Sequence, residues 1–176
     1  REDSSIDYVK LREKVIDTEL RFAPSAEDCV KIALRQDKFS KLLHENIIKL
    51  KINNIRIIKK IEKLSDLLTK ALADYDDQVL KRALHTLTLL TWCYYGQSSD
   101  IPDYGFVVSR KRLFSDPGEE FNLTTQQQDW CAMLRAYGDY SVDEFDLQVA
   151  RLVENGYLDE TGVHEEAKLF HEKIES

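Results

Sequence analysis

The stretch that decides the fold reads Asn53-Asn54-Ile55-Arg56-Ile57-Ile58-Lys59-Lys60-Ile61-Glu62-Lys63-Leu64, and it predicts an amphipathic helix. Its apolar residues recur at helical spacing, namely Ile57, Ile58, Ile61, Leu64 and, one turn further on, Leu68. Asn53 or Asn54 can begin this helix, because an asparagine side chain at the N-cap accepts a backbone N–H from the first turn.

Arg56 is the unusual residue of this helix. A cation in the first turn opposes the helix dipole, which favours an anion at that end. Free N–H groups, the positive helix end and a guanidinium group together suit a phosphate. The alternative is that Arg56 lies on a solvated face with the nearby lysines, which are Lys59, Lys60 and Lys63.

Two segments resemble parts of the AAA+ ATPases. Asn54-Ile55-Arg56, followed by an apolar helix, resembles the sensor-2 motif in the helical lid of that family. Upstream, the run from Arg12 through Glu13-Lys14-Val15-Ile16 to Pro24 resembles the end of the nucleotide-binding core, where a short strand and a proline lead into the first lid helix. The resemblance covers about the first half of the chain and extends to KAP-like and related bacterial P-loop ATPases, several of them in phage defence.

The resemblance implies roles for three residues. Asn54 and Arg56 would contact bound ATP, with Mg²⁺ accompanying it, and Arg56 would act in catalysis by stabilising the γ-phosphate. Arg12 would be the arginine that reaches the nucleotide of the next subunit, although Arg21 is an alternative for that role. An arginine of this kind implies a homo-oligomer.

The sequence contains neither a G-x-x-x-x-G-K-[ST] phosphate loop nor an apolar strand that ends in paired acids. We therefore expect this chain to be a C-terminal piece of an ATPase, with the nucleotide-binding core upstream as its partner. On this interpretation the chain alone does not hydrolyse ATP.

The predicted fold class is all-α, a multi-helix bundle. We expect a linker or core end over residues 1–24, a lid-like four-helix bundle over 25–96, a loop over 97–122 and a smaller helical module over 123–176. The helices are expected at about 25–35, 37–50, 54–72, 77–95, 125–137, 141–155 and 165–174, with the end of a helix at 4–14 and an edge strand or extended linker at 20–22. Capping boxes are expected at Ser25 with Asp28 and at Ser141 with Glu144, and Gly156 is expected in the left-handed conformation. The apolar helix over 77–95 is expected to be buried on most sides. Within the loop over 97–122, a short strand is expected at residues 106–108.

Composition narrows the function classes. The net charge of −7 argues against a nucleic-acid-binding module, because such binding relies on lysine and arginine neutralising phosphates. No apolar run approaches the roughly 18 residues of a membrane helix.

Cys29, Cys93 and Cys131 show no metal-ligand spacing and are expected to be free thiols in a reducing cytoplasm. His164 and His171 could share a helix face, but without a third ligand they do not predict a metal site.

Two alternatives to the lid remain open. The C-terminal helices followed by Tyr157-Leu158-Asp159 also fit a winged-helix pattern, although the helix that would enter the DNA groove is strongly acidic. The other alternative is an acidic helical adaptor whose C-terminal helices hold a protein partner. Reading the gene upstream of Arg1 for a phosphate loop would distinguish the adaptor from the ATPase.

Overall fold

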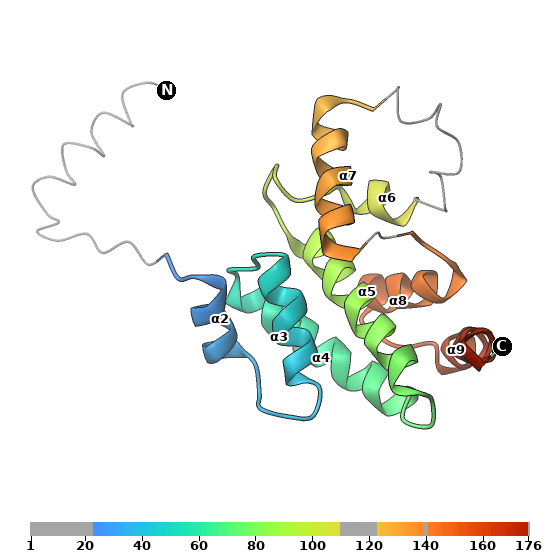
Figure 1. The fold of residues 1–176 in the computed structure, drawn as a ribbon. Coiled ribbons are helices and arrows are strands. Elements are labelled where there is room, and N and C mark those ends of the chain that lie inside the picture. The colour runs from blue at the N-terminus through green and yellow to red at the C-terminus, as the bar shows by residue number, and fades with distance from the viewer. Residues whose placement is uncertain (1–22, 110–122, 139–140, 176) are drawn as a thin grey trace, which may run out of the picture.

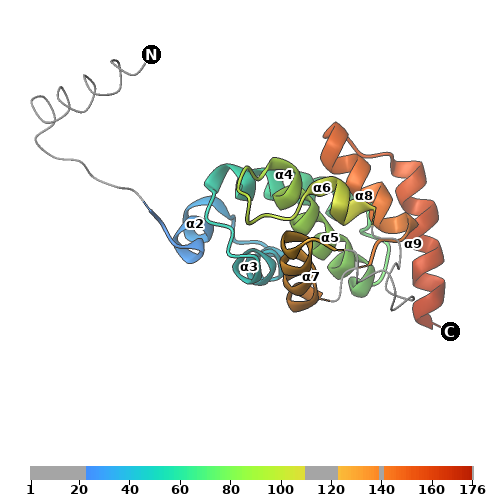
Figure 2. The same ribbon diagram turned by 90° about the horizontal axis from the view of Figure 1, so that it is seen from above.

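A computed structural model describes residues 23–109, 123–138 and 141–175. These residues form eight helices and no strand, so the predicted all-α fold is confirmed. Figure 1 shows α5 running through the middle of the molecule, with α2, α3 and α4 on one side and α8 and α9 on the other. Viewed from above, α2 and α9 lie towards opposite ends of this arrangement (Figure 2).

The first four described helices match the predicted ones closely. They are α2 (Ala26–Ala33), α3 (Ser40–Lys49), α4 (Ile55–Ala71) and α5 (Asp77–Tyr95). The capping box at Ser25 is confirmed, since the Ser25 side chain accepts the Asp28 N–H and the Asp28 carboxylate accepts the Ser25 N–H.

Two boundaries differ from the prediction. Helix α2 ends at Ala33 rather than Arg35, because Leu34 already has extended backbone angles. Helix α3 begins at Ser40 rather than Asp37. The carboxylate of Asp37 accepts the N–H groups of Phe39 and Ser40 and so holds a turn before the helix starts.

Helix α5 is the centre of the core. Twelve of its residues are buried, which confirms the expectation that it is enclosed on most sides. The buried side chains of α2–α5 and of α8–α9 form one continuous hydrophobic cluster, in which Leu87 and Leu90 of α5 and Phe145 and Val149 of α8 are among the most buried members. The expected division of the chain into a lid-like bundle over residues 25–96 and a smaller helical module over 123–176 stays a prediction.

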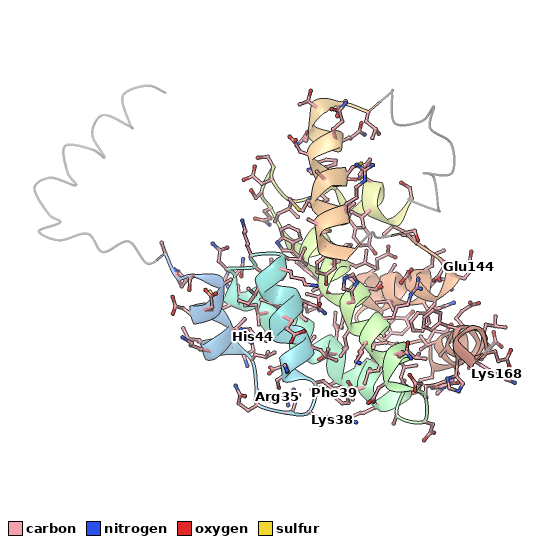
Figure 3. The ribbon with its side chains drawn as sticks, in the orientation of Figure 1. Arg35, Lys38, Phe39, His44, Glu144 and Lys168 are labelled. Atoms are coloured by element: carbon pink, nitrogen blue, oxygen red, sulfur yellow. The ribbon has the colours of Figure 1, made fainter. Side chains whose placement is uncertain are left out.

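A buried carboxylate ties the α2–α3 connection to α4. Glu62 is only 6% exposed, and its Oε1 accepts the Arg35 backbone N–H at 2.6 Å. The Arg35 side chain pairs with Glu62 at 3.1 Å and with Asp66 at 2.5 Å, while Lys59 pairs with the other Glu62 oxygen at 3.0 Å. Figure 3 marks Arg35 where the chain passes from α2 towards α3. Burial alone raises the pKa of Glu62, but these hydrogen bonds outweigh it and lower that pKa below 4.5.

This arrangement predicts a particular acid sensitivity. Because the pKa of Glu62 is lower in the folded state, its ionised form stabilises the fold fully above about pH 4.5, and that contribution is lost as the pH falls through the folded value. Glu62→Gln is expected to lower the free energy of unfolding at pH 7 by about 1–3 kcal/mol and to flatten its decline in acid. Urea unfolding at pH 7 and at lower pH measures both effects. Glu45→Gln, at an exposed position of α3, is the control, and parallel pH curves for wild type and Glu62→Gln would contradict the assignment.

The second half of the described chain contains α6 (Tyr104–Val108), α7 (Thr125–Gly138), α8 (Glu144–Asn155) and α9 (Glu160–Glu175). The prediction of a strand at residues 106–108 was wrong. Asp103 accepts the Phe106 N–H and begins a short helix there instead.

Two further details of this half correct the sequence analysis. The capping box of α8 is made by Asp143 with Asp146, not by Ser141 with Glu144. Helix α9 begins at Glu160 rather than Glu165. The left-handed conformation expected at Gly156 is confirmed by its φ of 74°. Because residues 157–159 lead straight into α9, they do not form the wing of the winged-helix alternative.

A second buried carboxylate joins α5 to α8. Asp146 is 1% exposed and lies within 2.8 Å of Arg82 and 2.7 Å of Thr86, both on α5. The same Arg82 guanidinium lies over the Phe170 ring of α9, 4.8 Å from its centroid. Arg82 therefore links three helices.

Several sequence expectations fall outside the described residues, among them those for Arg12, Arg21 and the strand at residues 20–22. The three cysteines are free and buried, as expected. None of the described helices is both long and apolar enough to cross a membrane.

Candidate functional site

Asn54 caps helix α4. Its backbone is extended, and its side-chain Oδ1 accepts the N–H of Arg56 at 3.0 Å and that of Ile57 at 3.4 Å. The choice between Asn53 and Asn54 as the N-cap is thereby settled. Two of the N–H groups that a phosphate could have used are thus already satisfied by this cap. Anion binding at this helix end must therefore depend mainly on side-chain cations.

Arg56 is solvent-exposed and lines a pocket of about 560 Å³ at the beginning of α4. Lys60, one turn further along α4, lines the same pocket. No aspartate or glutamate is among the described residues that line it, and none of the ion pairs in the described ranges involves Arg56. The pocket consequently offers two cationic groups with no internal counter-charge.

Two aromatic residues line the pocket beside these cations. Trp92 and Tyr95 come from the last turn of α5. The ammonium group of Lys60 lies over the Tyr95 ring, 5.1 Å from its centroid. The Tyr95 hydroxyl donates to the Val153 carbonyl oxygen of α8 at 3.3 Å, which holds the ring in place. A cationic rim beside a planar aromatic wall suits a phosphorylated ligand that also carries a flat ring.

Gly96 allows the chain to fold closely over the end of α5 and complete this pocket. A Cβ atom on Gly96 would lie 2.3 Å from the Cδ1 of Ile101 and 2.6 Å from the Trp92 carbonyl oxygen. The Ile101 side chain could move away from such a Cβ atom, but the Trp92 backbone carbonyl could not, so only glycine fits. The residues that follow, including Gln97, Ser98 and Ile101, form the remaining wall.

The structure thus brings Asn54 and Arg56 to one pocket and places Arg12 outside the described residues. Sequence reasoning missed the contributions of Trp92, Tyr95 and Lys60. In the sequence, Lys60 belongs to a basic run from Lys49 to Lys63 that fits either a solvated or a phosphate-facing helix face. The two aromatic residues were read as the end of a buried helix, and nothing in the local sequence indicates that the end of α5 meets the start of α4.

The two C-terminal histidines lie against Tyr75. The Tyr75 hydroxyl is 3.1 Å from the His164 carbonyl oxygen and 3.2 Å from its Nδ1, and the His171 ring meets the Tyr75 ring edge-on. Among the described residues, no group of three or more His, Cys, Asp or Glu side chains is placed to hold a metal ion.

Comparison of the chain with protein-family models, with curated proteins and with solved structures finds no match.

Proposed function

We propose that helices α2–α5 act as the lid of an AAA+-type P-loop ATPase and that Arg56 contacts the terminal phosphate of ATP bound by a separate core. The observation that carries this proposal is the carboxylate-free pocket at the start of α4, where Arg56 and Lys60 face an aromatic wall. The position of Arg56 at the head of the third helix of a four-helix unit agrees with the resemblance to the sensor-2 motif.

The charge of the pocket matches a polyphosphate. A guanidinium group can donate two parallel hydrogen bonds to phosphate oxygens, and Lys60 adds a second positive charge one turn away. Arg56 is exposed and has no carboxylate partner in the described ranges, so binding a phosphate would break no ion pair. Lys60 is already placed over Tyr95 and needs little reorganisation.

In this mechanism Arg56 acts by charge stabilisation. Phosphoryl transfer depends mostly on positioning and on neutralising the charge that spreads over the γ-phosphate oxygens. Arg56 would approach that group when the lid closes over the core. Loss of the γ-phosphate would remove the contact and let the lid move, so that hydrolysis rearranges the partner core or a neighbouring subunit.

Mg²⁺ accompanies ATP in such enzymes, but the residues that line this pocket do not fit it. Mg²⁺ takes oxygen ligands, chiefly carboxylates and phosphates, and the pocket wall contains two cations and no carboxylate. In this proposal the ion is held by the core. A homo-oligomer with Arg12 at the subunit boundary, and a role in phage defence, remain predictions from the resemblance.

The phosphate contact can be tested on this chain directly. Tripolyphosphate and ATP are titrated into the protein while the amide signals of residues 53–60 and the indole N–H signal of Trp92 are followed by NMR. We expect saturable shifts with a Kd on the order of 1 mM, since only part of the nucleotide site is present. Arg56→Ala should weaken binding by roughly tenfold, the value of one charge-assisted hydrogen bond.

Lys63→Ala is the matched control, because Lys63 is an exposed cation of the same helix that does not line the pocket. Equal losses in Arg56→Ala and Lys63→Ala would show that only the general positive charge of α4 matters. No saturable shift at all would contradict the proposal.

A helical adaptor is the second candidate function, and the exposed apolar residues of the C-terminal region favour it. Tyr157 is 67% exposed, and Leu169 is 51% exposed between the acidic positions Glu165 and Glu172 of α9. Single exposed apolar residues are common on protein surfaces, so this observation is weaker than the pocket. The phosphate titration separates the two functions, because an adaptor has no need of that site.

A further inference from the structure

A second pocket, of about 590 Å³, lies beyond the loop that follows α5. It is bounded by the end of α5, by α6 and by α7. It shares Gly96, Ser98 and Ile101 with the phosphate pocket described above. Its chemistry is the opposite, and the proposed ATPase function makes no use of it.

Three aromatic side chains line this pocket, each from a different helix: Tyr94 from α5, Tyr104 from α6 and Trp130 from α7. The rings of Tyr94 and Tyr104 meet edge-on, with centroids 4.9 Å apart and an angle of 74° between their planes. Rings set at a steep angle are common walls of a site that holds a cation on aromatic faces, and Trp130 adds a third ring to the lining.

Two of these rings, those of Tyr104 and Trp130, are held by contacts with neighbouring residues. The Tyr104 hydroxyl is 2.9 Å from the Glu154 carboxylate and 3.3 Å from the Ala150 carbonyl oxygen, both on α8. Trp130 lies against Phe106 with ring centroids 5.3 Å apart. Gln126, one turn before Trp130, donates to the Ser99 carbonyl oxygen at 3.1 Å and ties α7 to the loop. Little ordering would be required when a ligand binds.

The local charge is negative. Asp103 is the one charged side chain among the described residues that line the pocket. One of its oxygens caps α6 through the Phe106 N–H at 2.8 Å, and its net charge remains. Burial, followed by Glu154, raises the pKa of Tyr104, and burial, followed by Asp103, raises the pKa of Cys93. Burial opposes a charge of either sign, so only the smaller contributions of Glu154 and Asp103 reflect the negative local charge.

We infer that this pocket binds a quaternary ammonium group, held on the faces of Tyr94, Tyr104 and Trp130 and balanced by the carboxylate of Asp103. A quaternary ammonium donates no hydrogen bonds and is weakly hydrated, so aromatic faces can replace its water at low cost. Choline and trimethylated lysine carry this group, and both fit the volume.

The unmodified chain supplies its own reporters, because it contains two tryptophans, one in each pocket. Choline and free Nε-trimethyllysine are titrated separately while the two indole N–H signals are followed by NMR. We expect a saturable shift of the Trp130 signal with little change at Trp92. The tighter of the two ligands identifies the source of the ammonium group. The neutral isostere of choline, 3,3-dimethylbutan-1-ol, should bind at least about tenfold more weakly, since only the charge is missing.

Two variants sharpen this test. Asp103→Asn should weaken choline binding several-fold while keeping the cap of α6, because asparagine is also a good N-cap residue. Asp100→Asn is the matched control, since Asp100 is an exposed loop carboxylate that does not line the pocket. Tyr94→Leu should weaken binding about tenfold by removing one aromatic wall. Equal binding of choline and its neutral isostere, or no saturable shift of Trp130, would overturn the proposal.

Discussion

Replacing Arg56 with alanine is expected, on the proposed lid function, to lower the rate of ATP turnover about 100-fold in a complex with a nucleotide-binding core, with little effect on folding. The guanidinium would supply charge stabilisation to the γ-phosphate that no other described residue can replace. Lys60 is a point charge one turn away and lacks the paired donors of a guanidinium, and Asn54 is engaged in capping α4. Steady-state phosphate release by the complex measures the turnover, and circular dichroism checks the fold.

The control for this experiment is again Lys63→Ala, which should keep turnover within about twofold of the wild type, as expected for an exposed charge away from the site. Arg56→Lys distinguishes charge from geometry, because lysine keeps the charge but loses the two parallel donors. Wild-type turnover in Arg56→Ala would refute the lid assignment, whatever the phosphate titration shows.

Replacing Asp146 with alanine is expected to lower the free energy of unfolding by about 3–5 kcal/mol, the usual cost of removing one partner from a buried ion pair. The change leaves Arg82 and Thr86 of α5 without the carboxylate that they share, and it also removes half of the capping box of α8. Urea unfolding followed by circular dichroism measures the loss.

Asp143→Asn provides the comparison for this variant. The Asp143 side chain also contacts Arg82, at 2.8 Å, but it is 45% exposed, and asparagine preserves the N-cap. Its cost should stay below about 1 kcal/mol, as for most surface ion pairs. A loss of less than 1 kcal/mol in Asp146→Ala would show that the buried carboxylate does not hold α5 to α8.

The elements that the sequence predicted best are those with long, regular apolar spacing. Helix α5 was predicted at its observed ends, and α4 to within one residue, because 17 to 19 residues of helical spacing leave little freedom of interpretation. Helix α9 was predicted too short, since its first turn contains Gly162 and few apolar residues. Helix α6 was mistaken for a strand because Phe106, Val107 and Val108 are strand-forming residues, and the Asp103 cap decided otherwise.

The candidate site was only half predictable. Asn54 and Arg56 are neighbours in the chain, and their capping and exposure follow from local rules. Trp92 and Tyr95 reach the same pocket only because α4 and α5 pack together and Gly96 lets the chain turn back tightly. Such a meeting depends on tertiary packing, which periodicity within one helix cannot report. The second pocket is lined by residues from α5, α6 and α7, so the sequence could not predict it either.

The short wall formed by Gly96, Ser98 and Ile101 belongs to both pockets. Any ligand that displaces this wall on one side changes the shape of the cavity on the other. Thermodynamic linkage makes such an influence mutual: if an ammonium ligand alters the affinity for phosphate by some factor, phosphate alters the affinity for the ammonium ligand by the same factor. The glycine that closes the wall thereby supports one route for cooperativity between the two described pockets, beside the contact between the Tyr94 and Tyr95 rings.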